Sequence, residues 1–247
     1  MALPGVYKIF NDRWCKQTVW IYSDPHFGDK ELAAGFPNRP SDQEQIKMIN
    51  SKVGRNDTLI ILGDVGDIEC VKQLRGYKVL ICGNHDGGGT NYERQCSEWQ
   101  FDQTDYSKQQ AIEAVEKQCP NCKITVTEGF AFRNAGKINK IWVITADNQL
   151  FDEVYTGPLM IGEKLFLSHE PADIPFALNI HGHDHSGWEH KDWAHLNVCA
   201  DVINYTPINL NQILKSGAAA HVQSIHRQAI NDATKRAKKR EKKGKKK

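Results

Sequence analysis

The sequence predicts an α/β fold, because short apolar runs repeatedly end at a glycine or a polar residue. Thr58–Leu62 is continuously apolar, which is typical of a strand buried on both faces. Similar runs occupy 18–22, 78–82, 164–167 and 176–180. We therefore expect five strands with polar residues at their carboxyl ends, where open α/β sheets bind ligands. Helices are expected over 41–52 and 68–74 and from about residue 210.

Five polar motifs follow these five runs. They read DPHFGD from Asp24, GDVGD from Gly63, GNHD from Gly83, SHEP from Ser168 and HGHDH from His181. Their oxygen and imidazole donors, without a thiolate, suit zinc, manganese, iron or a similar divalent metal. Eight donors exceed the need of one ion but suit two ions sharing a carboxylate, a recurrent device for displacing a group from phosphorus. The donors are Asp24, His26, Asp64, Asn84, His85, His169, His183 and His185.

In these motifs the sequence resembles the calcineurin-like metallophosphoesterases, especially small bacterial and phage-type members. The family pattern D-x-H, G-D, G-N-H-D/E, H and G-H-x-H is present in order from Asp24 to His185. The likeness extends to Arg39–Pro40, 151–158 and 197–210, and it departs at Asp29, where this subgroup often has histidine. It implies a four-layer αββα sandwich: two mixed sheets face to face, helices outside, and metals at one sheet edge.

The resemblance also implies a role for each donor. Asp64 would bridge two ions, His85 would protonate the leaving group, and Asp86 would orient His85. A dimetal-bound hydroxide would be the nucleophile. Manganese is the expected metal, and zinc, iron or nickel are alternatives. The implied ligands are Asp24, His26 and His185 for the first ion, and Asn84, His169 and His183 for the second.

The expected activity is therefore hydrolysis of a phosphomonoester or phosphodiester. One alternative is a nuclease acting on DNA or RNA. Another is a non-catalytic interaction scaffold, as in one retromer subunit of the family, although a scaffold has no need for all the ligands and His85. Taken singly, Asp64 could cap a helix and Asn84 could cap a turn. Such structural roles are plausible for one motif and implausible for all five motifs at once.

The remaining polar residues near the motifs are assigned local roles. We expect His181 to make structural hydrogen bonds. We expect Asp67 and Asp184 to be solvated or to contact the metal ligands without binding the metal themselves. Four histidines without a surrounding motif are expected at the surface: His190, His195, His221 and His226.

The 247 residues suit one α/β domain, 1–232, with an insertion over about 87–150. The insertion opens with a flexible Gly87–Gly89 exit, and a helix over 106–117, capped by Thr104 or Asp105, is expected with strands over 123–127 and 141–144. Because it leaves the chain beside His85, it could cap the site and shape substrate choice. A subdomain away from the site is the alternative.

The end of the chain is strongly basic. Residues 233–247 contain ten Lys or Arg and one Glu, a charge of 10 − 1 = +9, so residues 1–232 sum to 2 − 9 = −7. Such like-charge blocks are normally disordered. The tail could bind nucleic acid electrostatically or could serve only solubility.

The seven scattered cysteines indicate a reducing compartment. No apolar run approaches a membrane span and no signal peptide is evident, so we expect a cytoplasmic protein without a membrane partner. Cys119 and Cys122 have the spacing of half a zinc knuckle, with Cys96 as a third candidate ligand; free thiols are the alternative.

Overall fold

The chain divides into two compact units, residues 1–91 with 151–247 and residues 92–150. The computed structural model describes residues 2–120, 122–133, 137–188, 192–222 and 225–244. The second unit corresponds to the expected insertion, but it begins at Tyr92 rather than near Gly87. The Gly87–Tyr92 segment forms η1, a 3-10 turn that contains the positive-φ residues Gly88 and Gly89.

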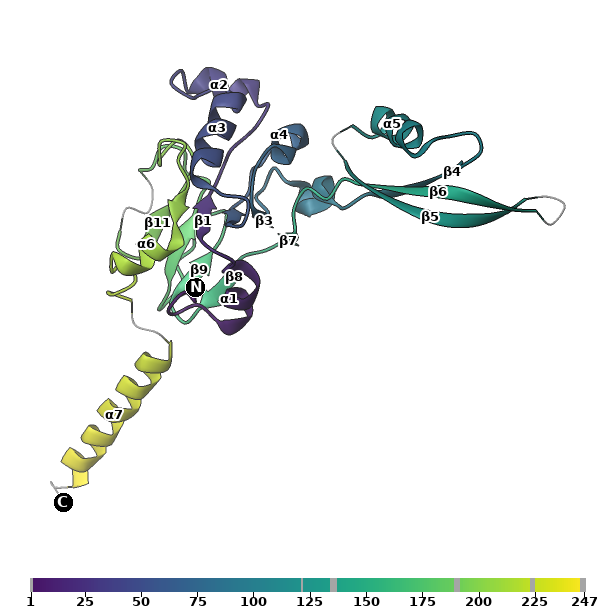
Figure 1. Cartoon of the computed structure of the whole chain (residues 1–247). Helices are drawn as coiled ribbons and strands as arrows, with labels where there is room; N and C mark the ends of the chain where they lie inside the picture. The colour runs from purple at the N-terminus through teal and green to yellow at the C-terminus, as the bar shows by residue number, and fades with distance from the viewer. Residues whose placement is uncertain (1, 121, 134–136, 189–191, 223–224, 245–247) are drawn as a thin grey trace. The chain divides into compact units, whose positions relative to one another are not determined.

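The first unit contains two mixed sheets flanked by helices, which confirms the α/β class (Figure 1). In the first sheet, every neighbouring pair is parallel except β12–β1. Its order is β12 (Ile208–Asn209), β1 (Val19–Tyr22), β2 (Thr58–Ile61), β3 (Tyr77–Ile81), β7 (Glu153–Tyr155). In the second sheet only β8–β9 is antiparallel. Its order is β11 (His195–Asn197), β10 (Leu178–His181), β9 (Leu165–Leu167), β8 (Leu159–Gly162).

One hydrophobic core joins the two sheets. Ile21 and Val79 of the first sheet and Leu167 and Ile180 of the second belong to the same buried cluster. Because side chains along a strand alternate between the two faces of the sheet, the strand residues adjacent to these core residues point away from the core. Tyr22, for example, donates its hydroxyl proton to Gln45 Oε1 at 2.7 Å, so the helix that carries Gln45 covers the other face of the first sheet.

The helices begin where the sequence places good caps. α3 (Asp42–Lys52), which confirms the helix expected over 41–52, opens with a capping box between Ser41 and Glu44. α4 (Ile68–Lys72) is capped by Asp67, which accepts from the amide of Glu69, so the alternative of Asp64 as the cap is wrong. The other helices of this unit are α1 (Lys8–Trp14), α2 (Lys30–Gly35), α6 (Leu210–Lys215) and α7 (Ile225–Gly244).

The second unit is an antiparallel sheet with one helix packed on it. Its strands lie in the order β4 (Cys96–Asp102), β6 (Lys137–Asp147), β5 (Lys123–Arg133), and α5 spans Lys108–Gln118. Ala111 and Val115 of α5 share a buried cluster with Ile144 of β6. The expected cap at Thr104 or Asp105 is wrong, because Ser107 forms a capping box with Gln110. The strands also extend well beyond the expected 123–127 and 141–144, and β4 was not expected.

The basic end of the chain is helical rather than disordered as far as Gly244. Charge repulsion opposes compaction, but it does not prevent a local helix. Alanine, lysine, arginine and glutamate are among the strongest helix formers, and they dominate residues 233–244. Composition therefore predicted the polarity of this segment correctly and its backbone conformation wrongly.

Candidate metal centre

The polar motifs lie where the two sheets meet at the carboxyl ends of their strands. β1, β2 and β3 lead into Asp24, Asp64 and Asn84, and β9 and β10 lead into His169 and His183. Backbone hydrogen bonds tie these loops together: Asp24 N donates to Gly63 O at 3.1 Å. Across the two sheets, His183 N donates to Asp24 Oδ2 at 2.9 Å. The fold thus gathers side chains that are far apart in the sequence.

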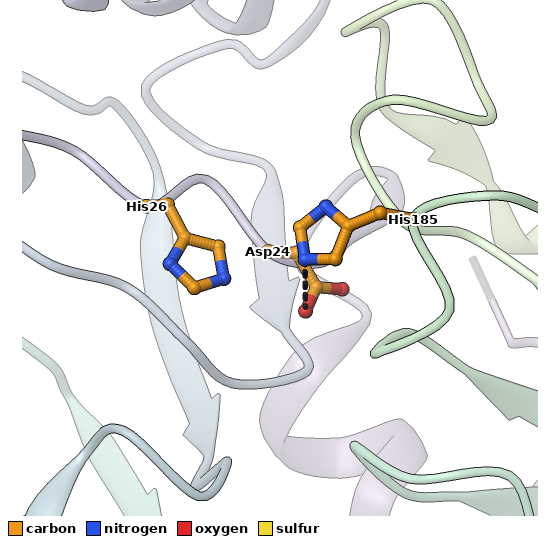
Figure 2. A group of neighbouring side chains, drawn as sticks. All are labelled: Asp24, His26 and His185. Atoms are coloured by element: carbon orange, nitrogen blue, oxygen red, sulfur yellow. Dashed lines mark ion pairs between the residues drawn. The ribbon is translucent and has the colours of Figure 1, made fainter. Parts of the chain in front are cut away.

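A first group of possible metal ligands consists of Asp24, His26 and His185 (Figure 2). One ligating atom from each lies within 4.8 Å of the others, and Asp24 Oδ1 is 3.9 Å from His185 Nε2. Asp24 Oδ1 and His26 Nε2 are buried and have no hydrogen-bond partner among the described residues. Burial of such atoms without a partner is costly. A bound divalent cation would satisfy both, so the group fits a metal.

A second group consists of Asp64, His169 and His183, again with ligating atoms within 4.8 Å of one another. Asn84 joins it, because its Oδ1 is 2.8 Å from His169 Nε2. His169 Nδ1 is 2.8 Å from Leu62 O, which can only accept. Nδ1 therefore carries a proton, and Nε2 is the nitrogen presented to Asn84, Asp64 and a metal.

Asp64 lies between the two groups. Its Oδ2 is 3.5 Å from His26 Nε2 and 3.3 Å from His169 Nε2, and its Oδ1 accepts from the amide of His85 at 2.9 Å. Burial alone would raise the pKa of Asp64, but the neighbouring rings of His169 and His26 hold that pKa far below its usual value. Burial lowers the pKa of His169, but the hydrogen bond with Asp64 and the negative charges of Asp24 and Asp64 outweigh it and raise the pKa to about 9. The site therefore concentrates negative charge suited to a cation.

Four candidate ligands have a left-handed backbone, which is uncommon outside glycine. The φ angles are 55° at Asp24, 43° at His26, 50° at Asp64 and 65° at His183. Each such residue costs on the order of 1–3 kcal/mol, and this strain is typical of functional sites. Gly182 allows the close approach of these loops, because a Cβ there would overlap Ser23 Oγ and Asp24 Oδ2. The fold thus accepts strain in order to bring these side chains together.

His85 and Asp86 lie in the same loop but in different environments. The His85 side chain is 68% exposed, with Nε2 3.9 Å from Asp64 Oδ2 and its ring 5.6 Å from that of His26. Asp86 is buried and accepts from the amides of Gly83 at 2.7 Å, Asp64 at 2.8 Å and Val65 at 3.0 Å. These contacts make Asp86 a support for the ligand loops. Its orienting role toward His85 stays a prediction.

Asp201 is a site residue that the motifs do not reveal. It accepts from His185 Nδ1 at 2.7 Å and from Arg39 Nη1 at 2.5 Å, and Arg39 Nη2 also donates to the carbonyl of Asp24 at 2.9 Å. Burial opposes ionisation of Asp201, but hydrogen bonds from His185 and Tyr205 and the charge of Arg39 lower its pKa to about 2. The carboxylate therefore fixes the His185 proton on Nδ1 and turns Nε2 toward Asp24.

Cys199 also lies near this pair, so the three residues His185, Cys199 and Asp201 form a further group of possible metal ligands. Burial raises the pKa of the Cys199 thiol far above its usual value. The thiolate is the form that binds metals. Because Asp201 Oδ2 is already bound by His185 Nδ1 and Arg39 Nη1, we assign this group to orientation of His185 rather than to another ion.

Replacing Asp201 by asparagine is expected to weaken metal binding at the first group, because His185 loses the partner that fixes its tautomer. A loss of such a partner typically costs 10–100-fold in metal affinity, so we expect roughly that loss for Mn²⁺ by calorimetric titration. Asp192→Asn is the matched control, because Asp192 makes the same contact with His195 Nδ1 at 2.9 Å outside both ligand groups. Equal affinities for the two variants would refute the assignment.

The structure also places the residues expected to have minor roles. His181 is fully buried with Nδ1 2.9 Å from Gly182 O, which agrees with a structural role. Asp184 is buried and accepts from Ser186 N at 3.0 Å, so it is not solvated. His195 is buried, so the surface prediction was wrong there, whereas His221 is exposed as predicted. His190 and the side chain of His226 lie outside the described residues. Asp29 caps α2 by accepting from Leu32 N at 2.9 Å.

All seven cysteines are free thiols. Cys119 and Cys122 pack against the core of the second unit, and Cys96 is exposed. Within the described parts of the chain, the groups that could hold a metal do not include these three residues. The free-thiol alternative is the one that the structure favours.

Comparisons with known proteins do not assign the chain to a family. No protein-family profile and no curated protein matches it. Among solved structures, a protein of unknown function from Aquifex aeolicus is similar, with a TM-score of 0.46 and 19% identity over 80% of this chain and 98% of that chain. A likeness this weak assigns neither a fold family nor a function to the chain.

Among the described residues, no helix combines the length and apolar character needed to cross a membrane.

Proposed function

We propose that the protein is a two-metal phosphoesterase of the calcineurin-like class. The observation that carries the proposal is the position of Asp64, whose Oδ2 lies within 3.5 Å of a ligand nitrogen from each group. One carboxylate so placed can bind two ions. The unpartnered, buried Asp24 Oδ1 and His26 Nε2 support the same conclusion. On this proposal, the two sheets and the helices around them form the four-layer sandwich of that class.

When bound, two divalent ions such as Mn²⁺ would supply a hydroxide nucleophile at neutral pH and positive charge beside the phosphoryl oxygens. Asp24, His26 and His185 would hold one ion, and Asn84, His169 and His183 the other. Leu62 O and Asp201 keep the ring protons of His169 and His185 on Nδ1, so that both Nε2 atoms face inward. His85 would donate a proton to the departing oxygen, because it is an exposed histidine beside Asp64 that belongs to neither ligand group.

The proposal is tested by hydrolysis of bis-p-nitrophenyl phosphate and p-nitrophenyl phosphate by metal-free protein, with and without added Mn²⁺. We expect turnover that depends on the metal and that Asp64→Ala abolishes. Asp12→Ala is a control, because Asp12 is an exposed partner of Lys8 on α1. Two bound ions without turnover of any ester would contradict the proposal and favour a scaffold.

A nuclease is the second candidate, and the basic helix α7 favours it. Removal of residues 233–247 takes away the +9 charge counted above. If this segment binds DNA or RNA backbones, the truncated protein should bind them more weakly and with a shallower dependence on salt. Fluorescence anisotropy with a labelled oligonucleotide measures both. Unchanged binding and salt dependence would exclude the tail as a nucleic-acid arm.

A further inference from the structure

A pocket of about 320 Å³ opens directly beside the second ligand group. Asn84 and His169 form part of its wall, and Phe166, Pro158 and Ala172 supply apolar surface. Leu165 and Leu167 belong to the core between the sheets, so the alternation of β9 directs Phe166 to the opposite face, into this pocket. The pocket is therefore a separate, partly apolar compartment attached to the candidate metal centre.

The wall of this pocket is held in place by a buried amide. Asn179 is 1% exposed and lies beside Phe166 in the register of β10 and β9. Its Nδ2 donates to Ser168 Oγ at 2.8 Å, and its Oδ1 accepts from Ala172 N at 2.8 Å. Ser168 Oγ in turn donates to Glu170 O at 2.7 Å. The loop from Ser168 to Ala172 is thus fixed without a ligand, which reduces the cost of binding one.

The proposed proton donor lies beside Asp64, between the two ligand groups, and outside the wall of this pocket. The ring of His85 is 5.6 Å from that of His26, which belongs to the first group. The pocket adjoins Asn84 and His169 of the second group, and His85 is not part of its wall. If the leaving group departs near His85, the pocket can therefore hold the organic substituent that stays bound to phosphorus. A phosphomonoester has no such substituent.

We propose that this pocket binds the retained organic group of a phosphodiester, and that it selects an uncharged, ring-sized group that packs against Phe166. The inference rests on the proposed function and names its substrate class. Phe166, Pro158 and Ala172 favour a planar apolar group. Glu170, an exposed acid in the same wall, disfavours a second anion and can accept hydrogen bonds from hydroxyl or amino groups. An aryl or nucleoside ester has this chemistry, whereas a polyphosphate does not.

The test compares two diesters with the same leaving group, phenyl p-nitrophenyl phosphate and ethyl p-nitrophenyl phosphate. In each, water adds to phosphorus, the bond to p-nitrophenolate breaks, and the phenyl or ethyl monoester remains. The Mn²⁺-loaded protein should prefer the phenyl ester by roughly tenfold in kcat/KM, given the apolar area that a ring would bury. Phe166→Ala should remove that preference, so that the variant has a similar kcat/KM for the two esters.

Three further variants keep the test decisive. Ala172→Met fills the pocket without removing packing, and it should lower kcat/KM for the phenyl ester more than for the ethyl ester. Phe132→Ala is the matched control, because Phe132 is 81% exposed in the second unit, and it should keep the preference. With a 4-carboxyphenyl ester, the wild-type protein should be slow and Glu170→Gln should be faster.

Equal kcat/KM for the two esters in the wild type would overturn the inference, as would variants that lower both esters by the same factor. The proposed function would stand in either case. Absence of turnover of every ester by the two-metal protein would overturn the proposed function and, with it, this inference.

Discussion

Replacement of Asp64 by alanine is expected to abolish hydrolysis and to leave the protein unable to hold two ions together. Asp64 Oδ2 lies near ligand nitrogens of both groups, at 3.5 Å from His26 Nε2 and 3.3 Å from His169 Nε2. A metal centre supplies several kcal/mol of transition-state stabilisation, so kcat/KM should fall roughly a thousandfold or more. Metal analysis of the dialysed variant should show fewer than two ions per chain.

Folding must be controlled in that experiment, because Asp64 also accepts from the amide of His85 at 2.9 Å. Asp64→Asn keeps an acceptor at this position but removes the charge, so it should fold like the wild type and still lose activity. If Asp64→Asn binds two ions with unchanged turnover, the bridging role is refuted.

Replacement of His85 by alanine is expected to slow the hydrolysis of esters with poor leaving groups and to have little effect on the hydrolysis of activated esters. His85 is 68% exposed beside Asp64, so its removal should not disturb the fold or the metals. General acid catalysis contributes roughly 10²–10⁴-fold, and that loss should appear with alkyl diesters, whose departing oxygen needs a proton. p-Nitrophenyl esters, whose leaving group is stable as an anion, should lose much less.

The control for this prediction is His221→Ala, because His221 is an exposed histidine outside both ligand groups. This variant should leave the rate of hydrolysis of both classes of ester unchanged. If His85→Ala lowers alkyl and p-nitrophenyl esters by the same factor, His85 is not the proton donor, and a role in binding the phosphoryl group would explain the loss.

That the five polar motifs meet at one edge of the sheets could be predicted because each motif is local. An apolar strand, a glycine and a polar residue are contiguous, as in Leu62-Gly63-Asp64, and the parallel sheet places such ends together. Asp201 could not be predicted in this way. Its partner Arg39 is distant in the sequence, and although Arg39 and Asp201 both lie in stretches that share the family likeness, no short motif marks their contact with each other or with His185. The general preference of ligand histidines for a carboxylate partner would have suggested searching for such an aspartate.

The second unit shows what a pattern search can miss. In β4, polar Glu98 and Gln100 alternate with Trp99 and Phe101, a two-residue period that could have predicted the strand. The helix cap was misplaced because Thr104, Asp105 and Ser107 are all good caps, and only the reciprocal bond with Gln110 distinguishes Ser107. Burial of His195 depends on its contacts with Asp192 and Ala172 O, which the sequence does not show.

The most direct test of the two-metal account is a titration of metal-free protein with Mn²⁺, in which bound metal and phosphodiester turnover are measured in the same samples. The account predicts that two ions bind per chain, that turnover reaches its maximum only when both sites are filled, and that electron paramagnetic resonance shows the two ions coupled. Full activity with one ion, or two uncoupled ions without turnover, would contradict it.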